Sequence, residues 1–173
     1  YMLSKMSNVQ NFTIHCMPEV EYFLKQPSLQ NLKSLTITSY LLYDMDVECL
    51  SLPNLTYLNI PAYCRERPLA KLLGALLPNA PNLKRLQIPD YPSTTELIKF
   101  IFDILPMTVE ELVLKDLDRL AVEIVLEEMK KRPSLKKIHF RCCVGKDLPS
   151  IFHSSMHLES LYVLNISEKT LLS

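Results

Sequence analysis

Residues 72–88 read LLGALLPNAPNLKRLQI, and the last six of these residues carry the phrase that decides the fold. The phrase is an apolar residue, two others, an apolar residue, one other and a final apolar residue. Along the chain it occurs seven times, at Val9/Phe12/Ile14, Leu32/Leu35/Ile37, Leu55/Leu58/Ile60, Leu83/Leu86/Ile88, Val109/Leu112/Leu114, Leu135/Ile138/Phe140 and Leu158/Leu161/Val163. The starts are 23, 23, 28, 26, 26 and 23 residues apart, and a fixed phrase at such intervals is typical of stacked structural repeats.

Each phrase predicts a short strand, because its last apolar residues alternate with residues that must point to the opposite side. Between the phrases, residues 68–77, 95–105 and 119–131 carry apolar residues at helical spacing. Since each helix must return the chain to the same edge, the strands are expected to run parallel. We therefore predict an α/β fold with one parallel sheet, as a single domain over residues 1–173.

The expected helix boundaries follow from capping residues and prolines. Ser93 with Glu96 forms a capping box before the second helix, and Asp118 is placed to cap the third. The third helix is expected to bury one apolar stripe, which comprises Leu120, Ile124, Val125 and Met129. Prolines stand two to five residues ahead of five phrases, where a helix must stop before its strand begins; they are Pro27, Pro53, Pro81, Pro106 and Pro133.

The copies SLQNLKSLTITSY, SLPNLTYLNIPAY, NAPNLKRLQIPDY and KRPSLKKIHFRCC resemble leucine-rich repeats, and the resemblance covers about residues 9 to 166. It implies a horseshoe solenoid of about seven repeats, with the parallel sheet on the concave face and the helices on the convex face. The repeat lengths are most similar to the intracellular cysteine-containing and ribonuclease-inhibitor-like kinds. The sequence departs from the family at the ninth place, which usually holds an inward Asn or Cys, because only Cys143 matches there.

Composition and charge argue against several classes of protein. Lys plus Arg and Asp plus Glu both number 19, so the net charge is +0 and we do not expect a dedicated nucleic-acid or anionic-membrane binder. The most apolar stretch, Leu69–Leu77, is too short to span a bilayer. The N-terminus lacks the pattern of a signal peptide, and because it opens on Tyr1 we expect a part of a larger protein.

Cysteine usage indicates an intracellular protein, either cytoplasmic or nuclear. The chain has five cysteines, an odd number with no CxxC spacing, which favours reduced thiols. Three N-x-S/T triplets, at Asn11, Asn54 and Asn165, favour a secreted protein instead, because they are acceptor sites for N-glycosylation. Such triplets arise readily by chance, and a glycan at Asn11 or Asn165 would crowd neighbouring repeats.

If the strands line the concave face, the residues between the apolar anchors project into it and form a binding surface. Arg and Tyr are frequent energetic anchors in interfaces, and they occur here among other polar residues. The predicted partner-binding residues are Tyr57, Asn59, Arg85, Gln87, Glu111, Lys137, His139 and Tyr162. The alternative is that many of them are ordinary solvated strand positions.

Two arrangements of residues suggest chemistry other than partner binding. His139 near Cys142 and Cys143 hints at a thiol nucleophile, but no orienting carboxylate or oxyanion-hole glycine accompanies them, so we do not expect an enzyme. His153 and His157 have a spacing that suits a metal, yet no third ligand lies close in the sequence.

No cofactor is expected, because the two isolated glycines, Gly74 and Gly145, cannot form a phosphate-binding loop. Lys130-Lys131-Arg132 with Lys136-Lys137 is the densest basic cluster and is a candidate for contact with nucleic acid. Three glutamates just before this cluster favour a solvated helix end instead.

These observations predict a protein–protein interaction domain that recognises a partner protein. The phrase LLGALLPNAPNLKRLQI resembles the repeats of F-box proteins, which implies substrate recognition for a ubiquitin ligase. Similar irregular arrays occur in innate-immune nucleotide-binding receptors, which implies a sensing or autoinhibitory domain as the alternative. An RNA-binding or purely structural array is the remaining alternative.

Overall fold

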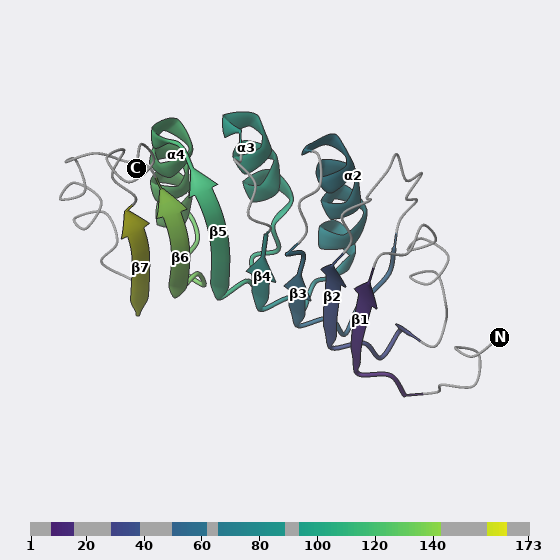
Figure 1. Cartoon of the computed structure of the whole chain (residues 1–173). Helices are drawn as coiled ribbons and strands as arrows, with labels where there is room; N and C mark the ends of the chain where they lie inside the picture. The colour runs from purple at the N-terminus through teal and green to yellow at the C-terminus, as the bar shows by residue number, and fades with distance from the viewer. Residues whose placement is uncertain are drawn as a thin grey trace.

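The computed structural model describes residues 8–15, 29–38, 50–61, 66–88, 94–142 and 159–165. Seven strands in these residues form one open parallel sheet, in which each strand pairs with the next one along the chain (Figure 1). They are β1 (Asn11–His15), β2 (Ser34–Thr38), β3 (Tyr57–Asn59), β4 (Arg85–Gln87), β5 (Glu111–Leu117), β6 (Lys137–Cys142) and β7 (Ser160–Asn165). Every strand begins two residues after the start of one of the seven phrases. The predicted strands and their parallel direction are therefore confirmed.

The register of the sheet places equivalent residues of successive strands opposite one another. The middle anchors pair in sequence, Leu35 with Leu58, Leu58 with Leu86, and Leu86 with Leu112. These four side chains have 0% exposure. The repeated leucines therefore line up from strand to strand and form one continuous core. Burial of these leucines fixes the register, because a slip by one residue would turn each leucine to the other face.

The turn before each strand is also repeated. Before each of β2 to β6, the first apolar residue of the phrase donates its backbone N–H to the carbonyl three residues earlier, for example Leu55 to Leu52 at 3.0 Å and Leu83 to Ala80 at 3.1 Å. Pro53, Pro81 and Pro133 occupy the second position of such turns. Proline favours that position because its ring fixes φ near the value that the turn requires. The prolines thus favour the turns that lead into β3, β4 and β6.

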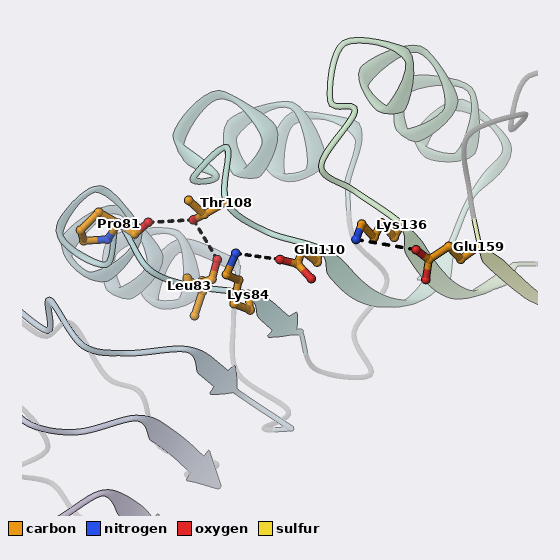
Figure 2. Close-up of polar contacts among 7 residues, drawn as sticks. All are labelled: Pro81, Leu83, Lys84, Thr108, Glu110, Lys136 and Glu159. Carbon is orange, nitrogen blue, oxygen red and sulfur yellow. Dashed lines mark hydrogen bonds and ion pairs between the residues drawn. The ribbon is translucent and has the colours of Figure 1, made fainter.

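Side chains in these turns connect one repeat to the previous one. Asn54 Nδ2 donates to Gln30 O at 3.0 Å, and Asn82 Nδ2 donates to Pro53 O at 2.8 Å. At the equivalent place the Thr108 hydroxyl donates to Pro81 O at 2.8 Å and to Leu83 O at 2.9 Å (Figure 2). The sequence lacks the row of inward asparagines that leucine-rich repeats usually have at the ninth place of the phrase. These side chains, here called the turn ladder, instead donate to backbone carbonyls of the previous turn.

Three helices in the described residues lie next to one another on one side of the sheet (Figure 1). They are α2 (Glu66–Leu76), which continues into η3 (Leu77–Asn79), α3 (Thr95–Ile104) and α4 (Arg119–Lys130). Each one connects two neighbouring strands, as predicted. The connectors 17–26 and 147–156, whose helical spacing is only partial, lie outside the described residues, as does nearly all of 43–50.

The helix N-termini confirm one predicted cap and correct the other. Asp118 Oδ1 accepts a hydrogen bond from the Ala121 N–H at 2.7 Å, as expected of the cap of α4. At α3 the cap is Thr94, whose hydroxyl accepts from the Leu97 N–H at 3.2 Å. The predicted cap, Ser93, lies outside the described residues. Thr94 takes the role because its backbone is extended and the helix begins at the next residue.

The buried stripe of α4 differs from the predicted one in phase. Leu120 is 61% exposed, so its assignment to the core was wrong. The buried residues of this helix are Ala121, Val122, Val125, Leu126 and Met129. At 3.6 residues per turn, Leu120 lies nearly opposite the centre of this stripe. The helix therefore packs small residues of its first turn against the sheet and leaves Leu120 in solvent.

Candidate protein-binding surface

The side of the sheet that faces away from the helices, here called the open face, displays the residues between the apolar anchors. The register places these residues in two rows that cross all the strands. The first row comprises Asn11, Ser34, Tyr57, Arg85, Glu111, Lys137 and Ser160. The second row comprises Thr13, Thr36, Asn59, Gln87, Val113, His139 and Tyr162. All eight predicted partner-binding residues therefore belong to strands that lie side by side, although the Tyr162 side chain is outside what the structure describes.

Four of the predicted residues contact one another across β3 to β6. The Arg85 guanidinium lies over the Tyr57 ring, 5.2 Å from its centroid. Arg85 Nε is 3.1 Å from Glu111 Oε1, and His139 Nε2 is 3.9 Å from the same oxygen. These contacts hold long side chains in defined positions, which lowers the entropy that a partner's binding would cost.

The second row provides hydrogen-bonding groups beside this chain of contacts. Asn59 and Gln87 face each other in the register of β3 and β4, and both are half-buried. The Asn59 Oδ1 is buried and accepts no hydrogen bond within the described residues. A buried acceptor without a donor costs free energy, so Asn59 does not contribute to the stability of the strand through this oxygen.

Sequence reasoning named Lys136 in the basic cluster but did not identify a third row of charges at the rim of the open face. Lys84, Glu110, Lys136 and Glu159 each stand immediately before a strand, from β4 to β7. Lys84 Nζ is 2.7 Å from Glu110 Oε1, and Lys136 Nζ is 3.7 Å from Glu159 Oε1 (Figure 2). The hydrogen bond from Lys84 lowers the pKa of the Glu110 carboxyl. These residues precede the strands, so the alternation of apolar and polar residues within the strands did not include them. An alignment of the phrases would have revealed that their charge alternates in sign.

The rim and the first row together line an open hollow of about 180 Å³, here called the charged hollow. Its lining residues are Lys84, Arg85, Glu110, Glu111, Lys136, Lys137 and Glu159. They give four cations and three carboxylates, so the hollow carries a small positive excess. Lys137 is exposed and forms no ion pair within the described residues. The excess positive charge of the hollow is therefore carried by Lys137, the first residue of β6.

The Lys130-Lys131-Arg132 part of the basic cluster, at the end of α4, is engaged in contacts within the protein. Lys130 Nζ lies 2.7 Å from Glu127 Oε1, and Lys131 Nζ lies 2.6 Å from Glu128 Oε1. Arg132 donates to Leu105 O at 2.9 Å and also to Phe102 O, which are carbonyls at the C-terminal end of α3. Burial lowers the pKa of this guanidinium. These contacts fit the expectation of an ordinary helix end more closely than a phosphate-binding patch.

The remaining chemical candidates fall largely outside what the structure describes. Cys143, His153 and His157 belong to undescribed segments, and the side chain of Cys142 is likewise undescribed. Within the described ranges, no three His, Cys, Asp or Glu residues gather in a way that could hold a metal ion. The helices in these ranges are also too short or too polar to cross a membrane.

No protein-family model matches this chain, and no curated protein matches it. The charged and aromatic residues of the open face are therefore the observations that bear on function.

Proposed function

We propose that this chain is a leucine-rich-repeat interaction domain that binds a partner protein through the open face of its sheet. In this proposal the sheet lines the concave side of a horseshoe solenoid and the helices form its convex side. The repeated turn before β2 to β6 and the in-register leucines support this assignment, because each repeat then buries its apolar residues against its neighbours.

The observation that carries the proposal is the row of contacts from Tyr57 through Arg85 and Glu111 to His139. Exposed ion pairs contribute only about 0–1 kcal/mol to stability, so the fold has little need of them. Arg and Tyr are nevertheless the side chains that most often supply binding energy in interfaces. A preorganised row of these residue types on an open sheet face suits recognition of a protein surface.

A protein partner is favoured over RNA by the distribution of charge. RNA binding depends on cations that are available to phosphates. In this chain, carboxylates separate the cations of the charged hollow, and the cluster at the end of α4 is engaged with Glu127, Glu128 and the carbonyls of α3. A mixed surface of this kind matches the alternating charges of a protein more closely than a polyanion.

The resemblance of the repeats to those of F-box proteins makes recognition of a ubiquitin-ligase substrate the most concrete form of this proposal. Its test is whether the full-length protein copurifies with a ligase scaffold. The sensing domain of an immune receptor is the alternative form, and it predicts a nucleotide-binding module in the full-length protein instead.

The test of the binding face is the double variant Arg85→Glu/Lys137→Glu. Both side chains are exposed on the first row, so the variant should keep its circular dichroism spectrum, and repulsion from Glu111 should lower its melting temperature only slightly. We expect it to lose the proteins that the immobilised wild-type chain retains from a cell extract, as identified by mass spectrometry. The matched control is Arg67→Glu/Lys99→Glu, which makes the same change of charge at exposed positions of α2 and α3. Equal loss in both variants, or loss in the control alone, would show that the open face does not bind.

A further inference from the structure

The charges of the charged hollow are arranged in bands, one sign for each strand. Lys84 and Arg85 belong to β4, Glu110 and Glu111 to β5, and Lys136 and Lys137 to β6, counting the residue before each strand with it. The register fixes this pattern, because Arg85 pairs with Glu111 and Glu111 pairs with Lys137. The open face therefore presents two positive charges, then two negative charges, then two positive charges across three neighbouring strands.

We propose that the charged hollow binds an α-helical segment of the partner, laid across the strands. The segment has an acidic residue at position i over β4, a basic residue at i+3 or i+4 over β5, and an acidic residue at i+7 over β6. This inference rests on the proposed function, and it specifies the chemistry of the partner.

The spacing of the bands selects a helix over an extended peptide. Neighbouring strands are about 4.8 Å apart, so β4 and β6 are separated by about 9.6 Å. Seven residues of α-helix rise about 10.5 Å, and residues i, i+3 or i+4, and i+7 share one face. In an extended chain, three residues span about 10 Å, but side chains three apart point to opposite faces. Residues two or four apart share a face yet span about 6.6 or 13 Å, which misses the bands.

The ion pairs already present do not prevent such binding. Lys84–Glu110 and Arg85–Glu111 are exposed or half-exposed pairs, and pairs of this kind hold their partners weakly. A helix of the complementary pattern would set an opposite charge above each band without separating these pairs. Lys137 has no ion pair of its own within the described residues, so the acidic residue at i+7 should contribute most to affinity.

The test uses three alanine-based peptides of about 18 residues, a length at which such sequences form helix. The alternating peptide has Glu at i, Lys at i+4 and Glu at i+7. The acidic peptide has Glu at all three positions, and the reversed peptide has Lys, Glu and Lys. Binding of each labelled peptide is measured by fluorescence anisotropy, with a single-stranded RNA oligonucleotide as a further ligand.

We expect the alternating peptide to bind about tenfold more tightly than either of the other peptides, because like charges placed opposite each other are strongly unfavourable. Glu111→Lys leaves the β5 band with no net charge beside Glu110, so the alternating peptide should lose its advantage over the acidic peptide. The matched control Glu96→Lys, at an exposed position of α3, should leave the order unchanged.

Three results would overturn the inference. These are equal binding of the alternating and reversed peptides, tightest binding of the acidic peptide or the RNA by the wild-type chain, and binding of no peptide at millimolar concentrations. Failure here is distinct from failure of the proposed function. If Arg85→Glu/Lys137→Glu still loses its protein partners while the peptides fail, the open face binds proteins but not through a helix of this pattern.

Discussion

The two sides of the same strands differ in how strongly the fold constrains them. On the packed side of β4, Leu86 has 0% exposure and is opposite equivalent leucines in β3 and β5. On the open side, Arg85 and Gln87 are opposite residues of other types, and the chemistry changes at every strand. The repeated phrase therefore determines the packed side, while the residue types on the open side are free to vary. Substitutions on the two sides of one strand should separate stability from binding.

The largest effect is expected for a charge placed on the packed side. Leu86→Asp removes a fully buried leucine and leaves a carboxylate without a partner, which should destabilise the fold by more than about 5 kcal/mol. Neighbouring strands should unfold with it, because Leu86 packs in one continuous core with Leu58 and Leu112. Circular dichroism during urea unfolding measures this loss.

The matched control is Gln87→Asp, which places the same carboxylate one residue further along, on the open side. Its free energy of unfolding should stay within about 0.5 kcal/mol of the wild type. Similar losses in the two variants would contradict the division of the strands into a packed side and an open side.

A smaller loss of stability is expected at Arg132, a polar residue whose hydrogen bonds join the end of α4 to the end of α3. Arg132→Ala leaves the Phe102 and Leu105 carbonyls at the end of α3 without this donor, which should cost about 2 kcal/mol. Denaturant unfolding measures the loss. Lys131→Ala removes a neighbouring exposed cation and should change stability little. Equal effects of the two variants would make Arg132 an ordinary surface residue.

The turn ladder should contribute less than Arg132. Thr108→Val removes the hydroxyl that donates to the Pro81 and Leu83 carbonyls, and it should lower the free energy of unfolding by about 1 kcal/mol. Thr108→Ser keeps the hydroxyl and should retain most of that stability. If the valine and serine variants are equally stable, these hydrogen bonds do not hold neighbouring repeats together.

The smallest effect is expected at the rim of the open face. Lys84 lowers the pKa of the Glu110 carboxyl, so their ion pair stabilises the fold above the pKa that Glu110 has in the unfolded chain. That stabilisation is lost as the pH falls through the lower pKa of the folded protein. Lys84→Met should raise the pKa of Glu110 toward its ordinary value while leaving the melting temperature nearly unchanged. Carbon-detected NMR titration of Glu110 measures the change, and an unmoved pKa would show that the pair does not form in solution.

The sequence predicted the packed side well because its signal is periodic and repeated. All seven strands, their parallel direction and the helix that begins after Asp118 followed from apolar spacing and one capping residue. The errors lie where the spacing is ambiguous. Leu120 fits an apolar stripe in the sequence, but the cap at Asp118 sets a phase that turns Leu120 to solvent.

The open side was predictable only in part. Alternation within the strands identified Tyr57, Arg85, Glu111 and His139 as neighbours, but it could not show that Arg85 packs on the Tyr57 ring. The rim residues Lys84 and Glu110 were missed because they precede the strands, where side-chain direction depends on the turn. Identification of a row of neighbouring side chains therefore needs the geometry of the turn as well as the period of the strand.

Both the core and the charge bands depend on equivalent positions of successive strands lying next to each other. Nuclear Overhauser contacts between leucine methyl groups test this arrangement directly. We expect contacts from Leu58 to Leu86 and from Leu86 to Leu112, and none from Leu58 to Leu112, which the register places two strands apart. Absence of the first two contacts, or a direct contact between Leu58 and Leu112, would contradict the account.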